Sequence, residues 1–288
     1  LYGWTLFVVI QTGTIAAVAV AFARFTAVFF PGLSPDVFLG FTLTLPSGAI
    51  QVGLSEQRLL AVASVLVLTF INVWGVRTAA FVQTSLTLVK TLALVALILL
   101  GISIGRDPAA WSGNFGSGFL PPGGFSLPVL SMVGAAMVGS LFSMDAWNNV
   151  GFAGGELKNP AKDLPFAMVV GVLTVTVLYV SANFAYLSVL PAEGIANAPQ
   201  DRVGTAALQA MFGEPGLLLM AAAIMISTFG CNNGLILAGA RVYYAMAKDD
   251  LFFRSAGRLH PTHHTPHIAL WVQALWTSVL CLSGTYSQ

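Results

Sequence analysis

The 288 residues of this chain are 57% hydrophobic and only 8% charged, with a formal net charge of +1. A soluble domain has about 25% charged residues, and a mean hydropathy of +0.83 is too high for a single globular core. The small net charge removes the electrostatic basis for nucleic-acid binding. The composition therefore predicts an integral membrane protein that crosses the bilayer several times.

Seven apolar segments are candidates for membrane-spanning helices, because each approaches the roughly 20 residues needed to cross hydrocarbon. In chain order they are residues 4–30, 59–74, 81–104, 127–153, 164–190, 216–240 and 268–282. No alternating apolar pattern is long enough to predict a barrel strand. Residues 31–58, 105–126 and 191–215 are rich in Pro, Gly and Ser and are predicted to be loops on one side of the membrane.

Basic residues are distributed unequally between the connecting segments on the two sides of the membrane. One set holds seven of them: Arg77, Lys158, Lys162, Arg241, Lys248, Arg254 and Arg258. The other set holds three: Arg58, Arg106 and Arg202. Short loops with more Lys and Arg face the cytoplasm, so the first segment is predicted to run from inside to outside.

The fourth segment is the least regular of the seven. Residues 141–165 read LFSMDAWNNVGFAGGELKNPAKDLP, so Asp145 and two asparagines stand inside an apolar run and three glycines follow. Hydrocarbon offers no water to a carboxylate or to unwound backbone. Such a segment predicts a discontinuous helix around a bound polar ligand. The alternative is a helix-end carboxylate close to the lipid headgroups.

Lys90 lies about ten residues into the third segment, roughly 15 Å deep at 1.5 Å per residue. An isolated ammonium near the bilayer centre costs at least about 2.5–3.5 kcal/mol. Lys90 is therefore predicted to face the interior of the helix bundle, where it meets a carboxylate, backbone carbonyls or a water-filled cavity, or to lose its proton. This pattern favours a functional lysine over a merely structural one.

Other polar residues also fall inside the apolar segments. They are Gln11, Thr12 and Thr14; Ser181 and Asn183; and Ser227, Thr228, Asn232 and Asn233. Hydrogen bonding between helices is the favoured interpretation for all of them. Gln11, Thr12 and Thr14 are, in addition, weaker candidates for the wall of a binding pocket.

The remaining chemistry-bearing residues give no case for an enzyme. Four histidines fall within residues 260–267, but no acid or thiol joins them, and a loop is favoured over a metal site. Cys231 and Cys281 stand in apolar surroundings and are predicted to be free thiols. Nucleotide-binding, hydrolase and metalloprotease motifs are not found in the sequence, so no cofactor and no metal are expected.

Three stretches resemble one family of transporters. Residues 142–167, with Asp145, Trp147–Asn148, Glu156-x-x-Asn159–Pro160 and Leu164–Pro165, resemble the sixth membrane helix and following loop of the amino acid–polyamine–organocation (APC) superfamily, L-type amino-acid transporter branch. Residues 239–253 resemble the loop after its eighth helix, although Asp250 stands where the family has Gly. Residues 72–94 resemble its fourth-to-fifth helix connection.

The resemblance implies a fold and a division of the chain. It implies an all-α integral membrane protein with the LeuT-like inverted-repeat (5+5) transporter fold, of which residues 1–288 form one partial transmembrane domain. Residues 1–104 would be the end of the first inverted repeat and residues 127–282 most of the second, so that the seven segments correspond to helices three to nine. The first two helices and everything after the ninth would then lie outside the chain.

The resemblance also implies a function and a site. It implies a secondary, sodium-independent transporter of the cell membrane, an exchanger (antiporter) or proton-linked carrier, that moves amino acids by alternating access. The broken segment would contact the substrate through Phe142, Ser143, Met144, Asp145 and Ala146, with Phe142 as an outer lid and Asp145 as a specificity residue. Lys90 would take the place of sodium and tether its helix to the absent first helix.

Two further expectations concern partners and rivals. Residues 31–58 contain no Cys, so no disulfide-linked heavy chain is expected, unlike the animal light chains of this branch. A non-transporting or regulatory protein of the same fold remains an alternative, because the first helix is absent. A membrane-embedded enzyme that uses Asp145 and the histidines is disfavoured, because the sequence offers no nucleophile and base at membrane depth.

Overall fold

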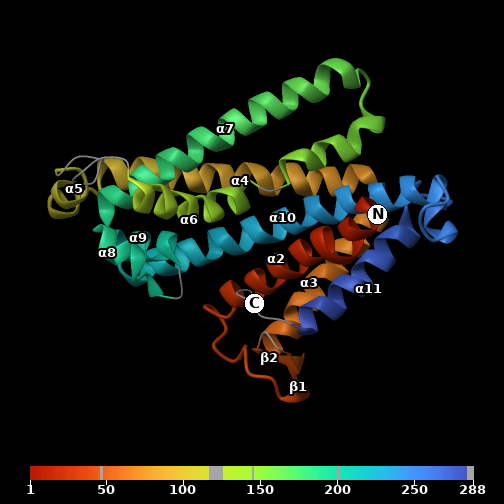
Figure 1. Cartoon of the computed structure of the whole chain (residues 1–288), viewed down its shortest axis with the longest axis horizontal. Helices are drawn as coiled ribbons and strands as arrows, with labels where there is room; N and C mark the ends of the chain where they lie inside the picture. Colours follow the sequence, from red (N-terminus) through yellow and green to blue (C-terminus); the bar gives the residue numbers. More distant parts are fainter. Residues whose placement is uncertain (46–47, 117–125, 145, 200–201, 284–288) are drawn as a thin grey trace. The chain divides into compact units, whose positions relative to one another are not determined.

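The computed structural model describes the whole chain except residues 46–47, 117–125, 145, 200–201 and 284–288. Helices account for most of the described residues (Figure 1). In chain order the helical elements are α1 (Tyr2–Thr5), η1 (Leu6–Ile10), α2 (Gln11–Thr26), α3 (Glu56–Val73), α4 (Val76–Ser103), α5 (Pro108–Phe115), α6 (Leu127–Ser143), η2 (Trp147–Glu156), α7 (Pro160–Val189), α8 (Ala192–Ala196), α9 (Val203–Phe212), α10 (Glu214–Lys248), η4 (Arg254–Gly257) and α11 (His267–Ser283). The strands β1 (Leu39–Leu45) and β2 (Gly48–Leu54) form an antiparallel hairpin.

Each of the seven predicted segments contains a helix. Among the described residues, five helical stretches are long and apolar enough to cross a membrane: Tyr2–Thr26, Glu56–Val73, Arg77–Ser103, Pro160–Val189 and Glu214–Lys248. The fourth and seventh segments contain α6 and α11, which are shorter at 17 residues each. The prediction of a helical, multi-pass membrane protein is confirmed.

The prediction of loops between the segments is wrong in part. Residues 31–58 contain the β-hairpin, residues 105–126 contain α5, and residues 191–215 contain α8 and α9. The start of α5 carried a recognisable signal, because Asp107 accepts the Ala109 N–H at 2.8 Å and Pro108 occupies the first helical turn. High Pro, Gly and Ser content marks the boundaries of such short elements as well as true loops.

The chain divides into two compact units, Leu1–Leu92 with Ala221–Gln288, and Ala93–Met220. In the first unit α2, α3 and α11 pack side by side (Figure 1). Two hydrogen bonds join distant segments of the chain at one end of this unit. The Trp4 indole donates to the Leu251 carbonyl at 3.1 Å, and Thr265 Oγ1 donates to the Val73 carbonyl at 2.8 Å.

Arg58 marks the opposite end of the first unit, where it donates to the Leu282 carbonyl at 2.8 Å. Four residues of the larger basic group follow or flank the end formed by Trp4, Leu251 and Thr265: Arg77, Lys248, Arg254 and Arg258. The unequal division of charge in the sequence therefore corresponds to two physical ends of this unit. Which end faces the cytoplasm stays a prediction.

The second unit has its own apolar core, built from α4, α7 and α9. The buried members of this core are Leu97, Ile98, Ala182, Ala185 and Leu208. Gly101 allows α4 to approach α7 closely, because an added Cβ would lie 3.0 Å from the Ala185 Cβ. Small residues at a helix contact are the usual packing device in membranes, where association gains little from the hydrophobic effect.

Candidate functional site

The helix predicted to be discontinuous is interrupted. Helix α6 ends at Ser143, and the Met144 N–H is shared between the carbonyls of Ser140 at 3.1 Å and Leu141 at 3.2 Å. Ala146 then adopts a left-handed conformation with φ 65° and ψ 7°, and η2 begins at the next residue. The predicted interruption of this helix is therefore confirmed. Because the last four carbonyl groups of a helix have no partner within it, the break leaves backbone acceptors near Met144.

The chain after the break is set up by local signals. Pro160 occupies the first turn of α7, where its missing N–H costs nothing. The Asn159 carbonyl accepts the Asp163 N–H at 2.9 Å, and the Asp163 carboxylate lies in the first turn, where the helix dipole favours negative charge. These residues start α7 immediately after η2, and the two elements pack against each other.

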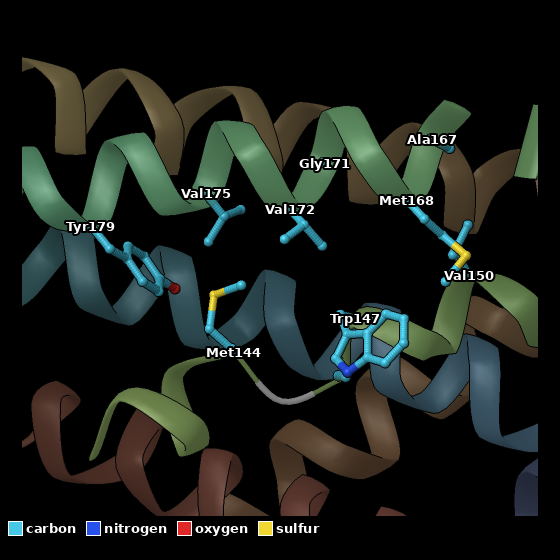
Figure 2. Close-up of a pocket in the computed structure, with 10 residues that line it drawn as sticks. Met144, Trp147, Val150, Ala167, Met168, Gly171, Val172, Val175 and Tyr179 are labelled. Atoms are coloured by element: carbon cyan, nitrogen blue, oxygen red, sulfur yellow. The ribbon is translucent and has the colours of Figure 1, made fainter. Parts of the chain in front are cut away.

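A cavity of about 290 Å³ lies between the break and α7 (Figure 2). One wall comes from Met144, Ala146, Trp147 and Val150, and the other from one side of α7. The α7 residues are Ala167, Met168, Gly171, Val172, Val175 and Tyr179. This volume is close to the lower end of the roughly 300–1,000 Å³ range of small-molecule sites.

The chemistry of this cavity suits a small molecule with an apolar portion. Its walls are aliphatic, thioether and aromatic, and among the described lining residues only Trp147 and Tyr179 carry a polar side-chain group. The helix break supplies carbonyl acceptors near Met144 and the first N–H groups of η2 near Trp147. A zwitterion needs both kinds of group, because its ammonium donates hydrogen bonds and its carboxylate accepts them.

The predicted binding residues of the broken segment fall into two sets. Met144 and Ala146 line the cavity. Asp145 lies outside the described residues, as do the side chains of Phe142 and Ser143. The lid assigned to Phe142 and the specificity role assigned to Asp145 stay predictions.

Gln11, Thr12 and Thr14 belong to the first unit, and their contacts there are structural. Gln11 is 3% exposed and donates from Nε2 to the Leu235 carbonyl of α10 at 2.9 Å, so the predicted interhelical bond is confirmed. Thr12 and Thr14 donate within their own segment, to Phe7 at 2.6 Å and Ile10 at 2.8 Å. Their predicted part in a pocket wall is not tested by these contacts.

Lys90 is half-buried on α4 and makes no ion pair or hydrogen bond with the part of the chain that the structure describes. It shares a helix face with Ala79, Gln83 and Leu86, since the positions are three and four residues apart. This face packs against α10, where Asn233 donates to the Ala79 carbonyl at 3.2 Å and to Gln83 Oε1 at 3.0 Å. Lys90 therefore lies on a face that contacts another helix.

The sequence analysis assigned no binding residue to α7, yet this helix supplies one wall of the cavity. The signal was present as a spacing: Met168, Val172, Val175 and Tyr179 recur at intervals of three and four residues. On an apolar segment this spacing cannot be separated from ordinary packing. The most exposed large apolar residues of α7 lie outside the cavity lining: Phe166, Val169, Val170, Leu173, Val177 and Val180.

The histidine segment forms a folded turn between η4 and α11. The rings of His260 and His263 lie 4.8 Å apart, and His260 Nδ1 accepts the N–H groups of Thr262 and His263, both at 3.2 Å. Within the described ranges, no group of three or more His, Cys, Asp or Glu residues is arranged to hold a metal ion. Partial desolvation and the neighbouring rings of His263, His267 and His264 lower the pKa of His260.

Comparison with known proteins gives one family. The family described as amino acid permease matches residues 1–287 of this chain. The serine/threonine exchanger SteT of Bacillus subtilis strain 168 is 34% identical over 232 residues, which cover 80% of this chain and 50% of SteT. The family match, over residues 1–287, extends over nearly all of the described structure.

Mammalian transporters are similar as well. The large neutral amino acids transporter small subunit 2 of Mus musculus is 30% identical over 239 residues, covering 80% of this chain and 42% of that protein. The b(0,+)-type amino acid transporter 1 of Mus musculus is 26% identical over 289 residues, covering 99% of this chain and 53% of that protein. The chain spans about half the length of these relatives.

Proposed function

Because this chain belongs to the amino acid permease family, we propose that the full-length protein is a secondary transporter of amino acids. It works by alternating access, as an exchanger or a proton-linked carrier. The observation that carries the proposal is the helix break at Met144–Ala146 beside a cavity of about 290 Å³. Unwound backbone is tolerated at membrane depth only where it lines a cavity or is buried in protein.

The proposed site joins the break to one face of α7. Backbone carbonyls near Met144 accept from the substrate ammonium, and the walls formed by Trp147 and α7 receive its side chain. Phe142 closes the site as an outer lid, and Asp145 favours substrates with an additional cationic group. Gln11, Thr12 and Thr14 retain only a secondary, proposed role.

The proposed architecture is the LeuT-like inverted repeat, with residues 1–104 ending the first repeat and residues 127–282 forming most of the second. This division differs from the two contact units, since α10 and α11 of the second repeat share a unit with α2 and α3 of the first. The exchange of helices between repeats supports the proposal, because it places each repeat in contact with the other.

Lys90 is proposed to replace a sodium ion and to tether α4 to the helix that precedes this chain in the full-length protein. Its half-buried position on a helix-contacting face supports this role. No disulfide-linked heavy chain is proposed, since the segment between α2 and α3 has no Cys.

Uptake by the purified full-length protein in proteoliposomes tests the proposal. Labelled amino acids are screened with and without unlabelled amino acid inside, and with and without a pH gradient. We expect saturable uptake that depends on internal amino acid or on the gradient, and loss or uncoupling of uptake in Lys90→Ala. Tight binding without uptake under every gradient would favour the regulatory alternative.

Two glycine-to-leucine variants, one in the cavity lining and one outside it, test whether the cavity is the substrate site. Gly171 lines the cavity, and a Cβ there has no atom within 4 Å, so the side chain of Gly171→Leu starts in open space and reduces the cavity volume. We expect KM to rise more for bulky than for small amino acids. Gly134→Leu on α6, equally free of neighbours within 4 Å and outside the cavity lining, is the control. Equal effects of both variants would remove the cavity from the substrate site.

A further inference from the structure

The β-hairpin between α2 and α3 has two chemically different faces. Leu39 pairs with Leu54 and Phe41 with Val52, whereas Gly40 pairs with Gly53. Directly paired residues of antiparallel strands project from the same face, and successive residues alternate between faces. The first two pairs therefore form an apolar face, and the opposite face carries the glycine pair.

The apolar face is exposed. Leu39 is 64% exposed and Phe41 is 65% exposed, and Val52 and Leu54 are only half-buried. On the opposite face Val37 packs against the glycine pair, since its Cγ1 would meet a Cβ added at either glycine, and the exposed side chains of that face, Thr42 and Gln51, are polar. Exposed apolar side chains gathered on one face of a hairpin whose other face is polar point to a partner that is itself apolar.

The hairpin is held in place. Arg58 is 5% exposed and donates from Nη1 to the carbonyls of Gln51 at 2.9 Å, Gly53 at 3.1 Å and Leu282 at 2.8 Å. One guanidinium thus links β2 to the ends of α3 and α11 (Figure 1). The direction of the apolar face is therefore set by the helices and not by a free loop.

The position of the hairpin in the chain indicates the partner. It joins two stretches that are long and apolar enough to cross a membrane, Tyr2–Thr26 and Glu56–Val73, so it lies where the chain leaves the bilayer. Residues 37–55 contain no charged residue. Exposed apolar side chains continue on both flanks, at Phe30 after α2 and at Leu59 in α3. The uncharged hairpin thus lies between two helical stretches that also expose apolar side chains, with Asp36 and Glu56 just outside it.

We propose that the apolar face of this hairpin, Leu39, Phe41, Val52 and Leu54, lies against the lipid bilayer at its interface with water. The hairpin does not enter the hydrocarbon, because its open strand edges need water or headgroups as hydrogen-bond partners. It works as an interfacial anchor, comparable to an amphipathic helix whose apolar side is buried among headgroups and upper acyl chains. Through Arg58 it fixes the ends of α3 and α11 relative to the membrane surface.

Spin labels on the two faces test this proposal in the full-length protein in phosphatidylcholine–phosphatidylglycerol liposomes. A nitroxide is attached to Cys in Phe41→Cys or in Thr42→Cys, in a background without other reactive cysteines. We expect the label at position 41 to collide more with oxygen, which concentrates in lipid, than with a water-soluble nickel chelate. The label at position 42 should show the reverse preference.

Two results would overturn the proposal. Equal nickel accessibility at both positions would place the apolar face in water. Shielding of position 41 from both reagents would show that protein covers it, from another part of the full-length chain, a second copy or another subunit. Leu39→Cys and Thr44→Cys repeat the comparison on the same two faces, and monodisperse gel filtration shows that each variant is folded.

Discussion

Asn72 on α3 donates from Nδ2 to Oδ1 of Asn233 on α10, at 2.9 Å, across 161 residues of sequence. Both side chains are buried, at 1% and 0% exposure. Asn233 donates in turn to Gln83 Oε1 at 3.0 Å, so three helices meet in one polar chain. The interhelical bond predicted for Asn233 is confirmed, whereas Asn72 was not singled out from the sequence.

Replacing Asn233 should destabilise the first unit. Asn233→Leu leaves the half-buried Gln83 Oε1 without this donor and the buried Asn72 Nδ2 without its acceptor on α10. An unsatisfied buried polar group costs about 1–3 kcal/mol. Unfolding of the detergent-solubilised full-length protein in increasing SDS measures the loss. In a double-mutant cycle with Asn72→Leu, we expect a coupling of roughly 0.6–1.7 kcal/mol, the range for hydrogen bonds between membrane helices.

Thr228→Val is the matched control for this cycle. Thr228 is on the same helix, but its hydroxyl donates to carbonyls of that helix, Ile224 at 2.8 Å and Met225 at 3.0 Å. Its removal should change stability by about 0.5 kcal/mol or less. Strict additivity of the two Asn substitutions would show that Asn72 and Asn233 are not coupled.

Gly239 on α10 is required by close packing. A Cβ there would overlap Gln273 Oε1 and lie 2.9 Å from Gln11 Cγ. Neither glutamine can retreat freely, since Gln273 donates to the Ile236 carbonyl at 3.4 Å and Gln11 to the Leu235 carbonyl at 2.9 Å. Gly239→Ala should therefore lower stability by about 1–3 kcal/mol, measured by thermal unfolding in detergent.

Gly13→Ala on α2 isolates this packing effect from helix propensity. No atom lies within 4 Å of a Cβ at Gly13, so the substitution should stabilise the helix by up to about 1 kcal/mol. Gly239→Ala has the same propensity gain. If both variants shift the unfolding temperature in the same direction, the close contacts of Gly239 do not determine the effect of adding a methyl group there.

Substitution by Gly should stabilise the protein at Ala146, whereas it destabilises an ordinary alanine within a helix. The left-handed φ of 65° at Ala146 costs roughly 1–2 kcal/mol for a residue with a Cβ, so Ala146→Gly should stabilise the helix break. Ala167 lines the same cavity from within α7, and Ala167→Gly should cost about 0.5–1 kcal/mol. Thermal unfolding of the two variants should give shifts of opposite sign, and a loss of stability in Ala146→Gly would contradict the left-handed assignment.

Stability of the histidine segment should fall in mild acid. Nδ1 of His260 accepts two backbone N–H groups, which an imidazolium cannot do, and the pKa of His260 lies below its ordinary value. The unfolded state then binds more protons than the folded state below about pH 6.5, so stability is complete above that pH and is lost as the pH falls toward the folded pKa. Thermal unfolding of the detergent-solubilised full-length protein between about pH 5 and 7.5 measures this loss.

His260→Asn should flatten this pH dependence, because the Asn side-chain oxygen can accept the same N–H groups and cannot take up a proton. His264→Asn is the control, since Asn tolerates the positive φ of 52° at His264. It removes only the smallest of the influences that lower the pKa of His260 and keeps the two N–H groups that His260 Nδ1 accepts. It should retain most of the wild-type acid sensitivity. If His260→Asn loses stability at low pH as the wild type does, a group other than His260 causes the acid sensitivity.

The helices and the break were predictable because both depend on local sequence. Seven apolar segments gave seven helical positions, since a chain in hydrocarbon satisfies its backbone groups locally by forming helices. The broken segment around Asp145 was predictable because polar residues and glycines interrupt an apolar run there. The short elements α5, α8, α9 and the hairpin were not predicted, since their stability depends on contacts with the helix ends that they cover.

The hydrogen-bond partners of polar side chains within the helices were less predictable than the positions of the helices. Interhelical bonds were expected for Asn183 and Thr228 as well as for Asn233, but Asn183 donates to the Tyr179 carbonyl of its own helix at 2.8 Å, and Thr228 also bonds within its helix. A polar side chain on an apolar helix can satisfy itself one turn back or across a contact. The sequence contains no signal that separates the two cases, because rotation about the helix axis decides which neighbour is within reach.

The sequence by itself determined that this chain crosses the membrane several times, where the helices of its seven apolar segments lie, and that one of these helices breaks beside Asp145. Those properties follow from hydropathy and from backbone hydrogen bonding, which act over a few residues. Only the tertiary structure decided that one face of α7 closes a cavity over Met144 and Trp147, and that Arg58 holds the hairpin to α11. Such contacts join residues far apart in the chain, and their geometry follows from helix packing, which no local pattern specifies.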